Sequence, residues 1–118
     1  MTKHFAIFDV CIDSCQKDSL KIKKTWLFAS LLREMKKETP DPWFIRAKTI
    51  YDSRTCNEIQ SDLFTLRAID KREDKYRRNT RFRIKYFIHE VDEHGWLKLS
   101  KRETIEAEEL LRKRGELA

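Results

Sequence analysis

Residues 81–89 (RFRIKYFIH) alternate between apolar and basic positions, which is the clearest pattern in the chain. One side of the stretch carries Phe82, Ile84, Tyr86 and Ile88. The other side carries Arg81, Arg83, Lys85, Phe87 and His89. Because side chains alternate across a β-strand, this two-residue period predicts a strand with one apolar and one basic face. We expect the basic face to point away from the core, where its cations attract phosphates or carboxylates.

The N-terminal third of the chain predicts a strand followed by a helix. Residues 5–12 (FAIFDVCI) are apolar almost throughout, as in a strand that is covered on both faces. In residues 17–37, apolar side chains recur at helical spacing in a stripe of Leu20, Leu27, Leu31 and Met35. Asp18 or Ser19 is suited to cap the start of this helix. The prolines within residues 39–42 end it.

The middle of the chain carries a weaker pattern. Residues 43–51 alternate and predict a second strand. For residues 63–69 we favour a third strand, because the local alternation fits a pleated backbone, and a helix over residues 57–68 is the alternative. Residues 70–80 have Tyr76 as their one apolar anchor, which predicts an exposed loop.

The last part of the chain predicts a hairpin and a helix. In residues 92–95 (DEHG), Gly95 is free to adopt a positive φ and to close a turn. The expected return strand contains Trp96, Leu97 and Leu99. Ser100 and Glu103 match the S-x-x-E capping box of a helix start. The buried stripe expected for this helix is Ile105, Ala107, Leu110 and Leu111, and Gly115 can end it.

These elements follow one another in the order β-α-β-β-β-β-α. Consecutive strands joined by short turns favour an antiparallel sheet. We therefore predict an α+β fold, with an antiparallel sheet of about five strands and two helices on one face. The length of 118 residues suits one domain, so residues 1–118 are expected to form a single basic α+β domain.

Composition narrows the choice of partner. Charged residues make up 39% of the chain, and the formal net charge of +6 suits an anionic partner. The chain has only two glycines, which excludes the usual glycine-rich loops that bind phosphates in nucleotide-binding folds.

The cysteines and the absence of a long apolar run predict a cytoplasmic protein. The three cysteines are an odd number, and no signal-peptide pattern precedes them. No apolar run approaches the roughly 20 residues that cross a bilayer, so no membrane partner is expected. Cys11 and Cys15 lack the second ligand pair of a zinc site, and we expect no metal or other cofactor.

The candidate site is the basic sheet face together with the neighbouring loop. If the strands predicted for residues 43–51, 63–69 and 81–88 are neighbours, their cations share one surface. The residues assigned to binding nucleic acid or another anionic partner are Arg46, Lys48, Arg67, Lys71, Arg72, Lys75, Tyr76, Arg77, Arg78, Arg81, Arg83, Lys85 and Phe87. Tyr76 and Phe87 are the rings expected to stack on unpaired bases. The alternative is a face that simply stays in water and keeps the sheet soluble.

Three functions are compatible with these patterns. The leading hypothesis is a small cytoplasmic protein without catalytic activity that binds an anionic surface, for which nucleic acid fits best. The second is a protein-interaction module or inhibitor, of the kind found among phage and mobile-element accessory proteins, that docks on an acidic protein or competes with nucleic acid. The third is a metal-dependent nuclease that uses Asp9, an acid inside an apolar strand, with Asp13 nearby. Residues 89–94 (HEVDEH) have the wrong spacing for the H-E-x-x-H motif of zinc hydrolases. The leading hypothesis, a protein without catalytic activity, assigns no catalytic residue.

Overall fold

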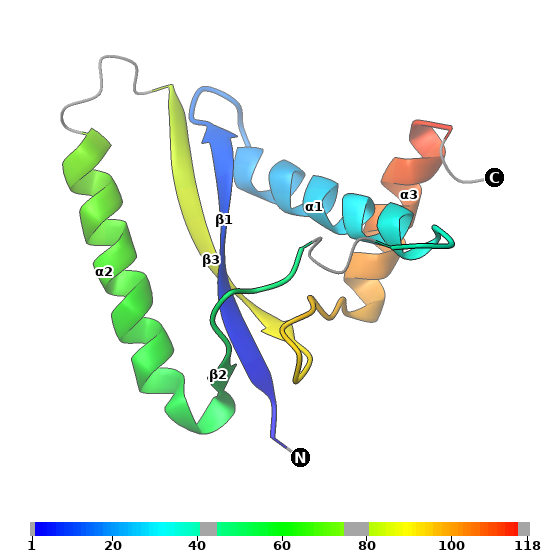
Figure 1. Ribbon diagram of the computed structural model, residues 1–118. Coiled ribbons are helices and arrows are strands. Elements are labelled where there is room, and N and C mark those ends of the chain that lie inside the picture. Colours follow the sequence, from blue (N-terminus) through cyan, green and yellow to red (C-terminus); the bar gives the residue numbers. More distant parts are fainter. Residues whose placement is uncertain (1, 41–44, 75–80, 116–118) are drawn as a thin grey trace.

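The computed structural model describes residues 2–40, 45–74 and 81–115, which form a three-stranded sheet with helices on both sides (Figure 1). The strands are β1 (His4–Asp13), β2 (Tyr51–Asp52) and β3 (Phe82–Val91). The α-helices are α1 (Ser19–Met35), α2 (Cys56–Asp74) and α3 (Lys101–Lys113), and a short 3-10 helix, η1 (Ser53–Thr55), precedes α2.

The sheet is antiparallel and has the strand order β2-β1-β3. β1 pairs with β3 along its whole length, from His4 opposite Val91 to Asp13 opposite Phe82. Among the described residues, β2 pairs with β1 only at His4 and Phe5. Because opposite residues of an antiparallel pair point to the same face, this register assigns each residue of β1 and β3 to one of the two faces.

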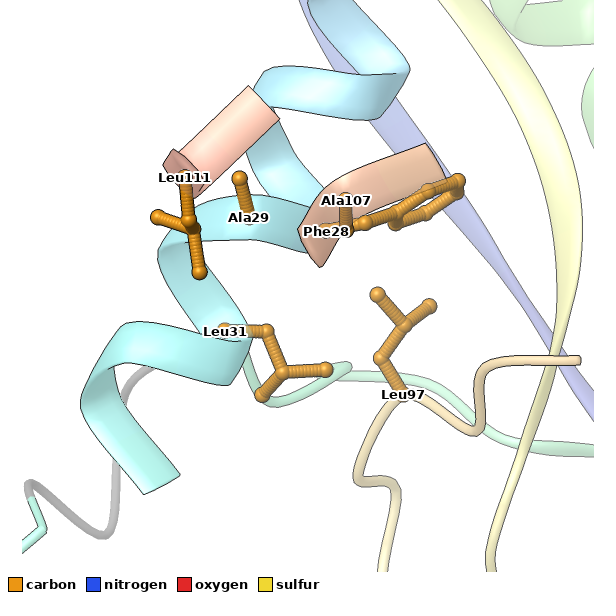
Figure 2. Packing of buried hydrophobic residues seen from close by; sticks show 6 residues of the cluster. All are labelled: Phe28, Ala29, Leu31, Leu97, Ala107 and Leu111. Carbon is orange, nitrogen blue, oxygen red and sulfur yellow. The ribbon is translucent and has the colours of Figure 1, made fainter. Parts of the chain in front are cut away.

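The main core lies between α1, α3 and one face of the sheet. Its buried cluster consists of Phe28, Ala29, Leu31, Leu97, Ala107 and Leu111 (Figure 2). From β1, Phe8 packs against this cluster, and its ring stacks on Phe87 of β3 with 5.7 Å between the ring centroids. Fully burying a side chain of this size contributes about 1.5–3 kcal/mol. The cluster therefore anchors both helices to the sheet.

The opposite face of the sheet is covered by α2 (Figure 1). Ile59 and Leu63 are buried beneath the helix, at 1% and 5% exposure, and both lie in its first half. Leu66 is half-buried, while Phe64 and Ile69 are exposed. The N-terminal half of α2 is therefore the part that holds the helix to the sheet.

The predicted fold class is wrong in its strands and its layers. In place of about five strands with helices on one face, the described residues form three strands with α-helices on both faces. The alternation in β3 predicts one covered and one solvated face. In fact Ile84 and Ile88 face α2, while Phe87 and Val91 are buried on the α1 side. An apolar residue on each side lets both faces be covered.

The strand predicted over residues 43–51 is not formed in the described part of that stretch, except at Tyr51. Ile45 has a φ of 53°, which an extended strand does not allow. Residues 43 and 44 lie outside the described residues. The predicted return strand is also wrong, because Trp96 and Leu97 make isolated bridges rather than a strand.

Residues 63–69 lie in α2, so the prediction of a strand there is wrong and the alternative, a helix over residues 57–68, is correct. Ile59 and Leu63 are one helical turn apart, and burying them together requires the helical period. Residues 70–74 of the predicted loop also belong to α2. Residues 75–80 lie outside the described residues.

The first helix was predicted to within two residues at each end. Its expected cap is not made, because Asp18 stands at the N-cap position with a φ of 58° and its side chain accepts no capping hydrogen bond. Ser19 is buried, and its hydroxyl instead accepts a hydrogen bond of 2.9 Å from the backbone N–H of Asp13. The start of α1 is thereby tied to the end of β1.

The capping box of the last helix is confirmed. Ser100 Oγ accepts a hydrogen bond of 3.2 Å from the Glu103 N–H, and Glu103 Oε1 accepts one of 2.8 Å from the Ser100 N–H. The predicted stripe is buried at Ala107 and Leu111 and half-buried at Leu110. The prediction for Ile105 is wrong, since 47% of this residue is exposed.

Candidate anion-binding groove

A hollow of about 440 Å³ lies between α2 and β3, and we call it the α2–β3 groove. It is lined by Leu20, Arg67, Asp70, Lys71, Arg83, Ile84, Lys85 and Tyr86. Four of these residues are cations that the sequence pattern assigned to anion binding. Two come from α2 and two from β3, so the fold brings them together from separate elements.

One wall of the groove is a stripe along α2. Arg67 and Lys71 are four residues apart, so their side chains lie one turn apart on the same side of the helix. Both are exposed. Phe64 precedes Arg67 by three residues and extends the same stripe by one further turn. The wall therefore presents an aromatic ring followed by two cations.

The other wall is formed by β3. Arg83 and Lys85 are two residues apart and lie on the face of the strand toward α1. β3 is an edge strand, so long side chains at this position reach solvent beside the sheet. Lys24 of α1 adds a further cation near this wall, with its Nζ 4.6 Å from the centroid of the Phe87 ring. The sequence pattern alone does not distinguish Lys24 from the other lysines of α1.

The charge of the groove is strongly positive. Among the described residues that line it, Asp70 is the one acid. Within the described ranges, no ion pair involves Arg67, Lys71 or Lys85. Cations whose charge is not neutralised by neighbouring carboxylates attract phosphates over several ångströms. The groove is therefore chemically suited to an anion with several charges along its length.

Two exposed phenylalanines stand close along the chain to the cations of the groove, although neither is among the residues that line it. Phe64 is 75% exposed and Phe82 is 48% exposed, which is unusual for so large an apolar side chain. Phe82 comes directly before Arg83, and the guanidinium carbon of Arg81 lies 5.4 Å from its ring centroid. Neither ring was assigned to the site from sequence. The sequence gives only a weak signal for such rings, because an apolar residue on a helix or strand is normally interpreted as part of the core.

Arg81 has a structural partner on the neighbouring strand. Its guanidinium donates from Nε and Nη2 to the carboxylate of Asp13, with distances of 3.2 and 3.0 Å to Oδ2. The hydrogen bond from Arg81 and a second from the Cys15 N–H hold the pKa of Asp13 below its ordinary value. Arg81 thus joins the start of β3 to the end of β1.

The remaining predicted residues are divided among other places. Arg72 is exposed in the last turn of α2, and Phe87 is buried at 5% exposure, so its ring cannot stack on a base. Arg46 and Lys48 line a second hollow on the opposite side of α2. Four of the assigned residues lie outside the described residues, namely Lys75, Tyr76, Arg77 and Arg78.

The second hollow has a volume of about 550 Å³ and lies beside β1, between residues 46–49 and α2. We call it the β1-edge groove. Among its lining residues, the hydroxyl of Tyr51 donates a hydrogen bond to Oδ2 of Asp62. This bond, together with burial, raises the pKa of Tyr51 to about 12. The phenol therefore stays neutral and keeps α2 tied to β2 at neutral pH.

Asp9 is exposed and lines the β1-edge groove. Within the described ranges, no group of three or more His, Cys, Asp or Glu side chains is arranged to hold a metal ion. The two histidines of residues 89–94 also make separate contacts. His89 pairs with Glu103 at 2.7 Å, whereas His94 lies 3.3 Å from Glu93 in the exposed turn.

Comparison with known proteins gives no match: no family model, no curated protein and no solved structure is similar to this chain. In the described part of the chain, no helix is both long and apolar enough to span a membrane. Any assignment of function therefore depends on the chemistry of the two grooves.

Proposed function

We propose that this chain is a binding protein without catalytic activity, and that its ligand is nucleic acid held in the α2–β3 groove. The observation that carries this proposal is the gathering of cations from two elements in one groove, Arg67 and Lys71 on α2 and Arg83 and Lys85 on β3. Nucleic acid carries a phosphate at every nucleotide, so several of its phosphates can contact the cations of both walls at the same time. The three cysteines are free and exposed, which supports a reducing compartment such as the cytoplasm.

The strength of such binding follows from the number of phosphate contacts. Contacts of this kind without base recognition give dissociation constants on the order of 10⁻⁴ to 10⁻⁶ M at physiological salt. The release of counterions makes the binding constant fall steeply with salt, with a slope close to one unit per contact on logarithmic axes. Salt dependence is therefore the signature to measure.

The test compares two double variants that lose the same charge. Arg67→Ala with Lys71→Ala removes two cations from the groove. Lys101→Ala with Lys113→Ala removes two exposed cations from α3, on the other side of the sheet (Figure 1). Binding of a labelled oligonucleotide is measured by fluorescence anisotropy over a salt series, and circular dichroism checks the fold.

We expect the groove variant to bind more weakly and to flatten the salt plot by about two units. The α3 variant should bind almost as the wild type does. Equal weakening in both variants would show that only net charge matters, and no binding by the wild type at low salt would remove the proposal.

A second candidate function is binding of a partner protein by strand pairing at the β2-side edge of β1. The Lys3 carbonyl accepts a hydrogen bond from the Ser53 N–H on the β2 side, whereas the Ser14 N–H donates to Arg81 on the β3 side. By alternation, the backbone groups of Asp9 and Cys11 point to the β2 side. In the described residues β2 does not extend that far along β1. An extended segment of a partner protein can pair with such an edge.

The discriminating variant for this second function is Cys11→Pro, which removes one N–H from the open edge without breaking the β1–β3 ladder. If a protein partner pairs with this edge, its capture by the purified chain should be lost in Cys11→Pro and kept in Cys11→Ala. Equal capture by both variants would contradict pairing at this edge. Loss of oligonucleotide binding is not expected for either variant.

A further inference from the structure

We infer that the α2–β3 groove selects single-stranded over double-stranded nucleic acid. This inference rests on the proposed function and concerns the same groove. It depends on the two exposed rings, Phe64 and Phe82, and on their position relative to the cations. The cations alone would accept any polyanion, because phosphate contacts carry little information about the bases.

Each wall presents one ring followed by two cations. On α2, Phe64, Arg67 and Lys71 share one stripe that spans about 10 Å, given the rise of 1.5 Å per residue. On β3, Phe82 to Lys85 spans about 10 Å at roughly 3.3 Å per residue. The strand and the helix run in opposite directions (Figure 1), so the two rings lie toward opposite ends of the groove.

This order suits a flexible strand with unpaired bases. Phosphates can follow the cations of Arg67, Lys71 and Lys85, while bases turn outward onto the rings at the two ends. Every base has a π-face, so stacking on Phe64 and Phe82 needs no particular sequence. In a duplex the bases are already stacked and paired, so the rings gain no partner unless the helix opens. Only the phosphate contacts then remain.

The exposure of the rings supports the same conclusion. Phe64 is the most exposed of the large apolar side chains in the described residues, at 75%. A phenylalanine that faces water on the same helix stripe as Arg67 and Lys71 contributes little to the core. The ring of Phe82 already has a guanidinium group near it, from Arg81 at 5.4 Å. Aromatic rings beside arginine are common in single-strand binding sites.

The experiment measures the affinity for labelled oligothymidine and for a blunt hairpin duplex of equal charge at several salt concentrations. The variants are Phe64→Leu, Phe82→Leu and the double variant, which keep an apolar side chain but remove the ring. The control is Ile105→Ala, because Ile105 is also half-exposed and belongs to α3, which lies on the other side of the sheet from α2 (Figure 1).

We expect the wild type to bind oligothymidine at least about tenfold more tightly than the duplex. Each Phe→Leu change should weaken oligothymidine binding about fivefold or more, with the duplex affinity and the salt slope unchanged. The control should bind as the wild type does. Equal affinity for single strand and duplex, or unchanged oligothymidine binding in the double variant, would overturn this inference while leaving the proposed function standing. If the wild type binds neither oligothymidine nor the duplex at low salt, both this inference and the proposed function are overturned.

Discussion

His89 at the end of β3 and Glu103 in the first turn of α3 are joined by a contact of 2.7 Å between Nε2 and Oε2. The other ring nitrogen of His89, Nδ1, lies 2.8 Å from the carbonyl oxygen of Glu90. Both contacts of the ring are with oxygen atoms, so His89 connects the main chain of β3 with the first turn of α3. Glu103 meanwhile uses Oε1 to cap Ser100. The carboxylate of Glu103 thus caps the start of α3 and also links this helix to β3.

The first prediction is that Glu103 makes the fold sensitive to acid. Burial raises the pKa of Glu103, but the Ser100 N–H and His89 together lower it below the ordinary value of 4.5. A carboxyl whose pKa is depressed in the folded state stabilises the fold above its ordinary value and loses that contribution as pH falls through the folded pKa. The unfolding free energy of the wild type should therefore fall more than that of Glu103→Gln as pH drops below 4.5.

Urea unfolding at neutral pH and at several acidic pH values measures this difference. Glu109→Gln is the matched control, because Glu109 is an exposed carboxylate on the same helix. The unfolding free energy of Glu109→Gln should change with pH as that of the wild type does. Parallel pH profiles for the wild type and Glu103→Gln would contradict the role given to Glu103.

The second prediction separates the cap of α3 from its packing. Ser100→Ala removes the capping hydroxyl and should cost about 1 kcal/mol. Leu111 is 2% exposed within the main core, so Leu111→Ala should cost about 2–5 kcal/mol. Thermal and urea unfolding measure both. A cost for Leu111→Ala no larger than that for Ser100→Ala would mean that α3 does not pack on α1 as described.

The third prediction concerns the phenol of Tyr51. Its hydrogen bond to Asp62 raises the pKa of Tyr51 to about 12, from an ordinary value of 10.0. Ultraviolet titration of the wild type should show a phenolate component near pH 12 that is missing from Tyr51→Phe. In Asp62→Asn that component should move down toward 10.0. The bond stabilises the fold below pH 10.0 and is lost as the pH rises through the folded pKa. An unchanged titration in Asp62→Asn would disprove the assignment.

The fourth prediction uses the two glycines as a matched pair. Gly95 and Gly115 both have a positive φ, of 89° and 71°. A Cβ at Gly95 would lie 3.1 Å from the carbonyl oxygen of Ala47 and 3.2 Å from Cδ1 of Ile50, whereas at Gly115 it would meet nothing within 4 Å. Gly115→Ala should cost about 1–2 kcal/mol from the backbone alone. Gly95→Ala should cost clearly more, as measured by urea unfolding. Equal costs would show that the hairpin turn is not pressed against residues 47–50.

The last helix could be predicted from sequence because its start depends on local chemistry. Ser100 and Glu103 satisfy each other's backbone groups within one turn, so no distant residue needs to be known. The burial of Ile105 could not be predicted in the same way. It depends on which side of α3 meets α1, and the structure turns Ala107 and Leu111 inward instead.

The helical region of residues 56–74 shows why the rest was missed. Its buried anchors, Ile59 and Leu63, are only two among many polar residues, so the helical period is short and faint. A strand at this position would place its cations on a face of the sheet. Arg67 and Lys71 in fact approach Lys85 from a helix that packs over the sheet. The cations were recognisable from sequence, but their meeting place depends on tertiary structure.

The two walls of the groove are anchored to different degrees, and this difference affects how selective the groove can be among nucleic-acid sequences. β3 is held along its length by β1, whereas α2 is buried mainly at Ile59 and Leu63 and carries its cations beyond them. Such a wall can adapt its distance to strands of different sequence, at an entropic cost when it is fixed by the ligand. Amide exchange in residues 66–74 should therefore slow on binding more than in β3. A groove built in this way is suited to tolerance of many sequences rather than to recognition of one.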